Sequence, residues 1–422
     1  MDEYKIAVIG LGYVGLPLAR LFSTRYKVVG YDINKRRIDE LNKGVDTTLE
    51  VDNRLLETAV NTKMLTCTSD VEGIADCNIY IIAVPTPVDR KYRPDLNPLI
   101  GASKLVGKVI SKGDIVIYES TTYPTCTEEV CIPAIEKESG MKYNVDFFAG
   151  YSPERINPGD KEHTVEKIRK VTSGSTPEVA DIVDGLYGSV LLNGTFKASS
   201  IKVAEASKII ENTQRDVCIA YFNELAKVFD AMGIDTGEVI EAASTKWNFI
   251  RLQPGLVGGH CISVDPYYLI QKAEECGVDA ELMKSARKTN EEMAEYVAGR
   301  IIHNMNKRGI MVKDASVLIA GVTFKENCPD IRNTKVVKIY DALHEYTDNI
   351  TLADCRCDIQ QASRLFRKDV CREIPNGKYD VIVLAVPHSE FVDVNYCGML
   401  NDNGFVYDLK SVLPKREDIV RL

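Results

Sequence analysis

The sequence predicts an α/β protein in which two doubly wound sheets are joined by a central helical region containing one long helix. Short apolar, β-branched runs alternate with helical patterns over residues 1–197, and this alternation resumes from residue 309. Between residues 198 and 308 the strand pattern stops and long helical patterns replace it. Continuous apolar strands that alternate with helices are typical of parallel sheets covered by helices on both faces.

The expected elements follow the chain in that order. In the first region, strands are expected at residues 5–10, 27–32, 78–85, 114–120, 146–151 and 170–173. The middle region has helical patterns at 201–232 and 280–307, interrupted by a Gly/Pro-rich loop at 254–259, and the last region has strands at 317–321, 380–386 and 404–408. Because 422 residues exceed one ordinary core, we expect three domains, 1–197, 198–308 and 309–422.

Composition and charge exclude several classes of protein. The formal net charge is −9, so the chain has no electrostatic reason to bind nucleic acid. No apolar run approaches the roughly 20 residues that span a bilayer, and the chain enters its first strand too early to leave room for a signal peptide. The twelve scattered cysteines are typical of reduced thiols in the cytoplasm. The spacing of Cys355 and Cys357 is too tight for a zinc pair, so no metal is expected.

A glycine-rich segment follows the first expected strand and opens a helical pattern at residues 16–23. Gly10 would permit a tight turn, Gly12 would let a pyrophosphate approach the backbone, and Gly15 would let the helix pack close to the strand. The phosphates would then lie at the positive end of the helix. The pattern therefore predicts a dinucleotide site on a Rossmann-like domain, the alternative being a glycine-rich turn without a ligand. The segment reads Gly10, Leu11, Gly12, Tyr13, Val14, Gly15.

An acidic residue stands about twenty residues after this segment, as the Rossmann fingerprint requires. Asp32 ends the second expected strand, where its carboxylate can accept hydrogen bonds from the adenosine ribose. A carboxylate there repels the 2′-phosphate of NADP, so NAD is the expected cofactor. Lys35, Arg36 and Arg37 follow closely and weaken this preference.

Two later strands end in residues that could face the cofactor. Pro85 and Thr86 follow one strand and Thr121 follows the next. Carboxyl ends of strands face the ligand in doubly wound sheets, so these positions could contact the nicotinamide ribose, the carboxamide or a reacting oxygen. The alternative is that they are ordinary turn residues at strand ends.

One cysteine has a setting that favours chemistry. Cys261 follows Gly258, Gly259 and His260 and precedes a helix whose expected cap is Asp265. A cysteine just ahead of a helix N-terminus is favoured as a thiolate, which is the nucleophilic form. The other eleven cysteines are interpreted as small buried apolar side chains.

A second constellation lies on the long helix. Lys208 and Asn212 are four residues apart and therefore share one helix face. An ammonium and an amide directed at one point could stabilise a developing oxyanion or hold a water molecule. The alternative is a solvated helix face.

These motifs occur together in one order with two others, residues 152–159 (SPERINPG) and 324–327 (FKEN). In this combination the chain resembles the UDP-glucose/GDP-mannose dehydrogenase family over essentially its whole length. Within that family it is most similar to the UDP-N-acetylhexosamine 6-dehydrogenases of bacterial capsule, O-antigen and Vi-type polysaccharide pathways. The resemblance implies four-electron oxidation of the C6 alcohol of UDP-GlcNAc or UDP-GalNAc to the uronic acid, with NAD as the oxidant. UDP-ManNAc and UDP-glucose are the alternative substrates.

The resemblance also implies roles for individual residues. Cys261 would be the nucleophile that forms a thiohemiacetal and then a thioester, with Lys208 and Asn212 at the oxyanion. Asp265, Thr121 and Glu154 would order the hydrolytic water, and Thr121 and Lys325 would also contact the cofactor. The residues implied in substrate binding are Glu154, Arg155, Lys208, Asn212, Arg251, Gly258, Lys325 and Arg332, and residues 249–255 would line the sugar and uridine pocket.

Two departures from the family pattern bear on the substrate. Pro158 stands where UDP-glucose dehydrogenases carry a second glutamate, which disfavours glucose and fits the N-acetylhexosamine branch. Ser263 stands where relatives in that branch commonly carry glycine, which would reduce the backbone freedom of the cysteine loop.

Two other functions compete with this interpretation. A two-electron hydroxyacid or sugar-phosphate dehydrogenase would share the glycine fingerprint, but it has no use for the cysteine loop or the second α/β region. A non-catalytic nucleotide sensor on the same fold would not need Cys261, Lys208 and Asp265. The apolar stripe at 217–229 and the resemblance both favour a homodimer or a higher homo-oligomer, the alternative being that the stripe packs within the chain.

Overall fold

The computed structural model describes residues 4–89, 92–155 and 164–422. The chain forms two compact units. Unit 1 comprises Met1–Glu211 with Tyr267–Gly277, and unit 2 comprises Asn212–Pro266 with Val278–Leu422. The boundary between them falls inside the long helix α7 (Ile201–Met232), whose bounds are those expected from the sequence.

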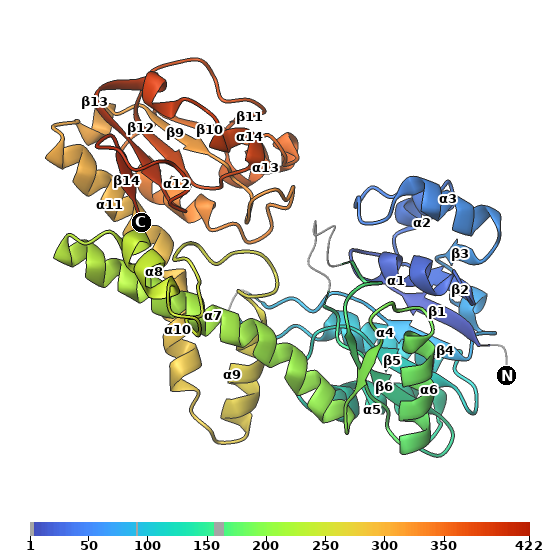
Figure 1. Ribbon diagram of the computed structural model, residues 1–422. Helices are drawn as coiled ribbons and strands as arrows, with labels where there is room; N and C mark the ends of the chain where they lie inside the picture. Colours follow the sequence, from blue (N-terminus) through green and yellow to red (C-terminus); the bar gives the residue numbers. More distant parts are fainter. Residues whose placement is uncertain (1–3, 90–91, 156–163) are drawn as a thin grey trace. The chain divides into compact units, whose positions relative to one another are not determined.

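Unit 1 contains a six-stranded parallel sheet with the strand order β3-β2-β1-β4-β5-β6 (Figure 1). The order reverses between β1 and β4, and doubly wound sheets bind their ligands beyond the carboxyl ends of the strands at such a point. The doubly wound fold expected for this region is therefore confirmed. The strands are β1 (Lys5–Ile9), β2 (Lys27–Tyr31), β3 (Leu65–Thr68), β4 (Ile79–Ile82), β5 (Ile115–Tyr118) and β6 (Phe148–Tyr151).

Helices cover both faces of this sheet. Ile6 and Val8 of β1 belong to one buried cluster with Leu18 and Val183, whereas Ala7, which points to the opposite face, is also fully buried. A strand buried on both faces carries a continuous apolar run, and this is the pattern by which the strands were predicted. The helices are α1 (Gly15–Phe22), α2 (Lys35–Leu41), α3 (Asn53–Asn61), α4 (Asn97–Gly107), α5 (Ile132–Ser139) and α6 (Pro177–Gly188).

One strand expected in the main sheet lies elsewhere. Strand β7 (Lys170–Thr172) forms, but it pairs in parallel with β8 (Thr195–Lys197) in a separate two-stranded sheet. The segment after β7 meets β6 through a single antiparallel bridge between Gly150 and Gly174. One antiparallel bridge does not extend a parallel ladder, so the expectation of a main-sheet strand at 170–173 was wrong.

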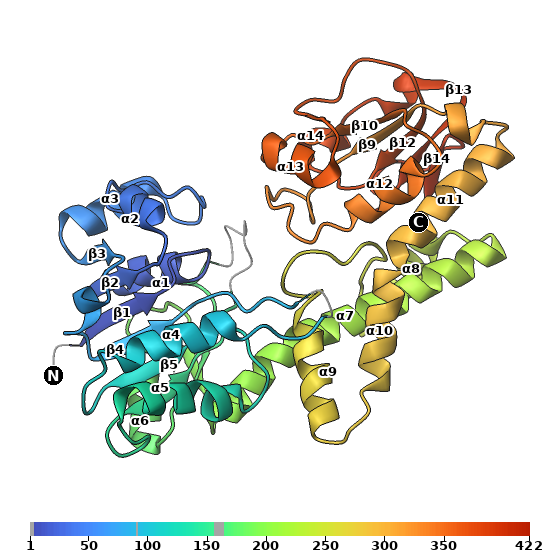
Figure 2. The same cartoon turned by 180° about the vertical axis from the view of Figure 1, so that it is seen from behind.

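Unit 2 contains a second six-stranded parallel sheet, with the order β11-β10-β9-β12-β13-β14 (Figure 2). Counted from β9, this is the same order as in unit 1, so the second doubly wound sheet is also confirmed. The reversal here lies between β9 and β12. The strands are β9 (Val317–Ala320), β10 (Ile350–Ala353), β11 (Val370–Cys371), β12 (Tyr379–Leu384), β13 (Leu400–Asp408) and β14 (Ile419–Arg421).

The second sheet is also buried on both faces. Val297 and Ile301 of a covering helix cluster with Val317 and Ile319 on one face, and Leu318 belongs to the cluster on the other. The described residues between 198 and 308 contain no strand, as expected. The remaining helices are α8 (Thr236–Ser244), α9 (Asp265–Glu275), α10 (Glu281–Glu291), α11 (Met293–Lys307), α12 (Val336–His344), α13 (Ile359–Phe366) and α14 (Ser389–Val392).

The single helix expected at 280–307 is two helices. α10 ends at Glu291 and α11 begins at Met293. α10 buries polar residues, with Arg287 and Asn290 both bonded to Asp216, whereas α11 buries apolar residues against the second sheet. No glycine or proline marks the break, so the sequence pattern did not reveal it.

Candidate active site

The glycine segment of unit 1 has the geometry of a phosphate-binding turn. Gly10 has φ +92°, a left-handed conformation that favours glycine, and a Cβ at Gly15 would overlap the carbonyl oxygen of Gly10. A Cβ at Gly12 would meet nothing within 4 Å, so the space before this exposed backbone is open to a ligand. Val14 precedes α1 and provides no side-chain cap, which leaves the helix N-terminus to an incoming phosphate. Tyr13 beside it is half-buried. The residues present therefore fit a dinucleotide.

Asp32 occupies the ribose position of this fold. Its carboxylate accepts hydrogen bonds from the backbone N–H groups of Leu11 (2.9 Å) and Asn34 (2.8 Å), and the residue remains partly exposed at the carboxyl end of β2. Arg37 does not serve as a cation for a 2′-phosphate, because its guanidinium is buried and pairs with Asp46 at 2.7 Å. The expected weakening of the NAD preference by Arg37 was wrong for that reason.

The loops after β4 and β5 are joined at the carboxyl edge of the first sheet. Ser120 donates its hydroxyl hydrogen to the carbonyl oxygen of Val84 at 2.7 Å. Thr86 and Thr121 flank this contact and are half-buried, and Pro85 is exposed. The predicted cofactor contacts Pro85, Thr86 and Thr121 therefore lie at the edge where the strand order reverses.

A buried ion pair that the sequence did not reveal supports the same edge. Lys170 donates to Glu119 at 2.6 Å and to the carbonyl oxygen of Pro153 at 3.1 Å, and both charged side chains are almost fully buried. Burial raises the pKa of Glu119, and the nearby Lys170 ammonium and the Tyr187 hydroxyl oppose this shift. The pair fixes the backbone just before Glu154. Glu119 directly follows the carboxyl end of β5, and this position could have indicated a role at the site.

The structure brings Glu154 and Lys208 together. The Lys208 ammonium lies 3.6 Å from the Glu154 carboxylate, and their side chains are 7% and 11% exposed. Asn212, one helical turn further along α7, is 8% exposed. The alternative of a solvated helix face for Lys208 and Asn212 is therefore excluded. Arg155 pairs with Glu211, also on α7. The rest of the predicted motif, 156–159 with Pro158, lies outside the described residues.

Glu205, one turn before Lys208, anchors the loop that follows Thr121. Its carboxylate accepts hydrogen bonds from the backbone N–H groups of Thr125 (2.6 Å) and Thr127 (2.9 Å). The side chain is fully buried, and burial raises its pKa to about 7 against the effect of these hydrogen bonds. The role of Glu205 as an anchor of this loop was not predicted from the sequence.

In unit 2, Cys261 lies in the turn directly before α9, as predicted. The carbonyl oxygen of Cys261 accepts hydrogen bonds from the N–H groups of Val264 (3.0 Å) and Asp265 (2.8 Å), and the residue is half-buried. Asp265 is 3% exposed, and its carboxylate accepts a hydrogen bond from the Asn212 amide at 2.5 Å. Two predicted catalytic residues 53 positions apart are thus in direct contact, four residues from the cysteine. Ser263 donates to the carbonyl oxygen of Gly259 at 2.6 Å, so it braces the cysteine loop.

The cysteine loop is interlocked with the segment that precedes α12. The Asn333 amide donates to the carbonyl oxygen of Gly259 at 3.0 Å, and a Cβ at Gly258 would lie 2.8 Å from the carbonyl oxygen of Asn333. The His260 ring meets the ring of Phe324 edge-on at 6.2 Å. Gly258 is therefore required by close packing on the backbone. Asn333 was not predicted from the sequence as a partner of this loop.

The three predicted substrate cations of unit 2 differ in their surroundings. Arg332 forms a bidentate pair with Asp330, with its side chain 51% exposed. Arg251 is exposed, and Lys325 is half-buried with its ammonium 5.6 Å from the ring centre of Phe324. Lys410 was missed. Its ammonium lies 2.9 Å from where a Cβ of Gly255 would be, and burial lowers its pKa. It follows the carboxyl end of β13, a position that could have suggested it.

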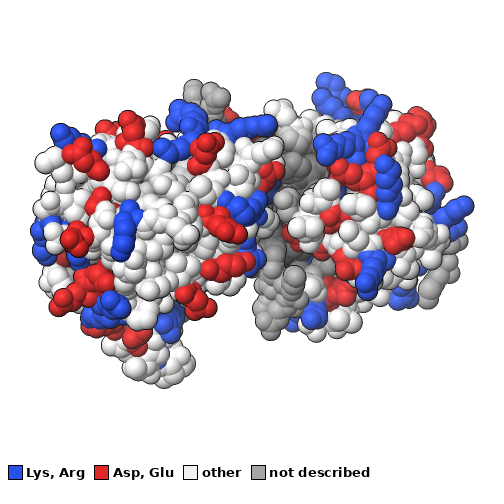
Figure 3. Space-filling view, turned by 90° about the horizontal axis from the view of Figure 1, so that it is seen from above, with Lys and Arg blue, Asp and Glu red and all other residues white. Residues whose placement is uncertain are grey.

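The described residues contain no group of three or more His, Cys, Asp or Glu side chains suited to a metal ion. No helix in the described part of the chain is both long and apolar enough to cross a membrane. Lys and Arg side chains are interspersed with Asp and Glu over the face drawn in Figure 3. That mixture is not the one-sided basic surface by which proteins bind nucleic acid.

Comparison with known proteins identifies the family. Three sequence models of the UDP-glucose/GDP-mannose dehydrogenase family match in order: its NAD binding domain at residues 4–191, its central domain at 202–292 and its UDP binding domain at 318–415. The chain belongs to this family. It is therefore an NAD-dependent nucleotide-sugar dehydrogenase, which confirms the resemblance, the enzyme class and the cofactor predicted from the sequence.

Relatives of this family match the whole chain. UDP-N-acetyl-D-glucosamine 6-dehydrogenase of Pseudomonas aeruginosa is 52% identical over 100% of both chains. The protein of the same name from Salmonella typhi is 50% identical over 100% of this chain and 99% of its own. Among solved structures, a UDP-D-ManNAc dehydrogenase from Pyrococcus horikoshii has a TM-score of 0.89 at 30% identity, covering 99% of this chain and 98% of that one. The fold and the family thus agree.

Proposed function

We propose that this dehydrogenase oxidises the C6 alcohol of a UDP-N-acetylhexosamine to the carboxylate through a covalent adduct on Cys261. UDP-GlcNAc is the first substrate to test and UDP-GalNAc the second. The two whole-length relatives named for UDP-N-acetyl-D-glucosamine support this choice. A role in the synthesis of capsule, O-antigen or Vi-type polysaccharide belongs to the same proposal.

The contact between Asn212 and Asp265 carries the proposal. It joins the helix of Lys208 to the helix that Cys261 precedes, at 2.5 Å and with both residues less than 10% exposed. If the half-buried thiol forms an intermediate that water must later hydrolyse, the neighbouring amide–carboxylate contact can hold the carboxylate that orders this water. A simple two-electron alcohol dehydrogenase would not need such an arrangement.

The proposed chemistry balances over two oxidations. NAD, when bound, accepts a hydride in each of them. Loss of hydride and the hydroxyl proton turns the C6 alcohol into an aldehyde, whose carbon the Cys261 thiolate attacks. Lys208 stabilises the oxyanion of this thiohemiacetal, with Asn212 beside it on α7. The second oxidation leaves a thioester, and water releases the carboxylate and returns the thiol. We assign Asp265, Glu154 and Thr121 to ordering that water.

Binding roles follow from the same proposal. Asp32 binds the adenosine ribose, and the turn with Gly10, Gly12, Tyr13, Val14 and Gly15 binds the pyrophosphate. Pro85, Thr86, Thr121 and Lys325 complete the cofactor contacts. We assign the cations Lys325, Arg332, Arg251 and Arg155, with the Gly258 backbone, to the UDP-sugar, because a diphosphate needs cationic and backbone N–H partners.

A substrate panel tests the proposed specificity. Initial rates with UDP-GlcNAc, UDP-GalNAc, UDP-ManNAc and UDP-glucose in excess NAD should give the highest kcat/KM for one of the first two. A preference for UDP-ManNAc would contradict the choice of GlcNAc or GalNAc, and a preference for UDP-glucose would contradict the N-acetylhexosamine assignment. Either result would leave the cysteine mechanism intact. Tight NAD binding without turnover of any of the four would instead favour a nucleotide sensor.

We further propose that the protein is a homodimer, or a higher homo-oligomer, through the middle of unit 2. A groove of about 660 Å³ there is lined mainly by apolar residues of α7, α10 and the loop after α8. Tyr221, Ile250 and Leu282 line it and are 58%, 67% and 70% exposed, which is unusual for large apolar side chains. Light scattering should give at least twice 47.0 kDa, and Leu282→Glu should shift the mass towards 47.0 kDa. A wild-type mass of 47.0 kDa would contradict the proposal.

The division into three domains, 1–197, 198–308 and 309–422, also remains a proposal. The order and the limits of the three matched family domains support it. A cytoplasmic location is likewise proposed, and the twelve free cysteines support it because secreted proteins commonly oxidise theirs.

A further inference from the structure

The two sheets repeat one local geometry at the end of their first two strands. Gly10 after β1 and Gly321 after β9 have φ +92° and +86°. The N–H group after each glycine donates to an aspartate that follows the neighbouring strand, Leu11 to Asp32 at 2.9 Å and Val322 to Asp354 at 2.7 Å. Asp354 thus holds in the second sheet the place that a ribose-binding carboxylate holds in the first.

Asp354 differs from Asp32 because another side chain covers it. His388, in the loop between β12 and α14, places Nε2 at 3.0 Å from the Asp354 carboxylate, and both residues are 0% exposed. The backbone N–H groups of Val322, Arg356 and Cys357 donate to the same carboxylate. Asp354 therefore cannot reach a ribose, and the second sheet uses its carboxylate to hold an imidazole.

The hydrogen bonds of His388 define its tautomer. The N–H group of Asn327 donates to Nδ1 at 3.0 Å, so Nδ1 carries no proton. The ring proton therefore lies on Nε2, which donates to Asp354 and lies 3.2 Å from the Thr323 hydroxyl oxygen. Burial alone would raise the pKa of Asp354, but hydrogen bonds led by that from His388 outweigh it and hold the pKa below its ordinary value. With the ring proton on Nε2, both ring nitrogens of His388 and both carboxylate oxygens of Asp354 have hydrogen-bond partners.

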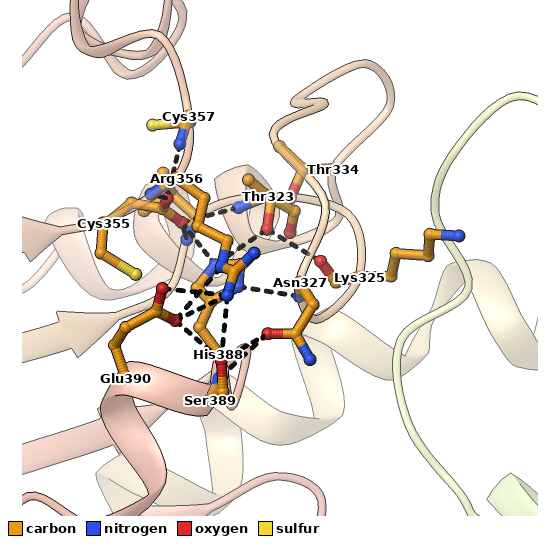
Figure 4. Close-up of polar contacts among 12 residues, drawn as sticks. Thr323, Lys325, Asn327, Thr334, Cys355, Arg356, Cys357, His388, Ser389 and Glu390 are labelled. Atoms are coloured by element: carbon orange, nitrogen blue, oxygen red, sulfur yellow. Dashed lines mark hydrogen bonds and ion pairs between the residues drawn. The ribbon is translucent and has the colours of Figure 1, made fainter. Parts of the chain in front are cut away.

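Apart from Asp354, the polar atoms that His388 contacts belong to the loop that carries Lys325. Thr323 donates its hydroxyl hydrogen to the carbonyl oxygen of Lys325 at 3.0 Å. Asn327 has φ +58°, and its side-chain oxygen accepts from the N–H group of Ser389 at 3.0 Å. Figure 4 shows the loop held on both sides of Lys325 by these contacts, with the Lys325 side chain pointing away from His388. These contacts fix the backbone of Lys325 and so determine where its side chain begins.

We propose that His388, oriented by Asp354, is a positioning residue that holds the loop of residues 323–327 so that Lys325 reaches the UDP-sugar. His388 itself touches no substrate, because it is fully buried. The charged neighbours on the facing elements are few. Arg356 and Glu390 pair with one another at 2.9 Å at the partly exposed rim, and the ring of Phe391 packs 5.7 Å from the imidazole. The inference rests on the proposed role of Lys325 in binding UDP.

Two substitutions separate the two hydrogen bonds of the imidazole. His388→Gln keeps an N–H group that can reach Asp354 but removes the acceptor for Asn327. His388→Asn places an amide oxygen near the position of Nδ1 and keeps that acceptor. Calorimetry with UDP should show affinity about fivefold weaker for His388→Gln but within about twofold of wild type for His388→Asn, since a fivefold loss is the size expected for one hydrogen bond to an ordered loop. NAD affinity should be unchanged in both.

A third variant and a double variant complete the test. Thr323→Val keeps His388 and removes only the hydroxyl that joins it to Lys325, so it should weaken UDP binding even if His388→Gln does not fold. In a Lys325→Ala background, His388→Gln should add nothing further, because its effect passes through Lys325. Equal losses in the Gln and Asn variants, a parallel loss of NAD affinity, or additive effects with Lys325→Ala would overturn the proposal. If Lys325→Ala itself leaves UDP affinity unchanged, the failure lies in the proposed role of Lys325.

Discussion

The side-chain amide of Asn333 donates a hydrogen bond to the carbonyl oxygen of Gly259 at 3.0 Å, two residues before the proposed nucleophile Cys261. The contact links the cysteine loop to the segment that carries Arg332. Gly258 packs against the Asn333 carbonyl at the same place, so the two loops are held together by two contacts. The position of Cys261 therefore depends on residues more than seventy positions away.

The first prediction concerns the close packing of Gly258 against the carbonyl oxygen of Asn333. A Cβ there would lie 2.8 Å from a backbone carbonyl oxygen, so Gly258→Ala should displace the cysteine loop. We expect kcat/KM for the UDP-sugar to fall about tenfold or more, because small misplacements of a reacting group are costly, while NAD affinity stays unchanged. Gly299→Ala is the matched control, since Gly299 lies inside α11 with nothing near its Cβ position. Wild-type rates for Gly258→Ala would show that the packing is dispensable.

Substitutions in the buried pair of Lys208 and Glu154 should affect turnover and the free energy of unfolding differently. Lys208→Met removes the proposed oxyanion partner, so turnover should fall about a hundredfold with a smaller change in UDP affinity. It also removes a cation from the buried Glu154 carboxylate, which should lower the free energy of unfolding by about 3 kcal/mol.

Adding Glu154→Gln to Lys208→Met should restore part of the stability but none of the turnover. Lys202→Met on the same helix is the control, because the side chain of Lys202 is 57% exposed. If only the KM of the UDP-sugar changes in Lys208→Met, the residue binds substrate and takes no part in the chemistry.

Asp32 should govern the choice between NAD and NADP. Asp32→Ala removes the carboxylate that opposes a 2′-phosphate, so the ratio of kcat/KM for NADP to that for NAD should rise about tenfold or more. The rate with NADP should rise only modestly, because Arg37 forms an ion pair with Asp46 and cannot bind the 2′-phosphate. Asp39→Ala, an exposed position on α2 with the same change in net charge, should leave the ratio unaltered. An unchanged ratio in Asp32→Ala would remove Asp32 from the cofactor site.

Glu205 predicts a pH dependence of stability. Burial raises its pKa in the folded protein to about 7, above its ordinary value of 4.5. The folded state therefore binds the proton more tightly, and the stability that this gives is present below pH 4.5 and lost as the pH rises to about 7. The loss amounts to about 3 kcal/mol at most. Urea unfolding at pH 5 and pH 8 should show a steeper decline for wild type than for Glu205→Gln, and equal declines would contradict the prediction.

The sequence predicted most of the strands that are buried on both faces. Strands β1, β2, β4 and β5 are buried on both faces and carry the continuous apolar runs that were read correctly. Strand β3 (LTCT) was missed because it lies at a sheet edge and only alternate residues are buried. The break between α10 and α11 was missed because no glycine or proline marks it in the sequence.

The local motifs of the candidate site could be predicted from the sequence, but the contacts between its segments could not. Glycine spacing and the helix after Cys261 indicated local geometry, because both depend on neighbouring residues. The contact of Asn212 with Asp265 and that of Asn333 with Gly259 join distant segments, and nothing in the local sequence encodes such pairs. Glu205, Lys170 and His388 were missed for a related reason. These three side chains are buried in the fold, and the burial of a charged or polar residue cannot be inferred from the sequence.

The most direct test of the central claim is the number of NADH molecules formed per molecule of sugar. Limiting UDP-GlcNAc, and separately UDP-GalNAc, would be converted to completion in excess NAD and the product read by absorbance. A four-electron oxidation through Cys261 predicts two NADH per sugar with at least one of these substrates. One NADH per sugar would contradict it, because the reaction would then stop at the aldehyde and leave the cysteine without a role.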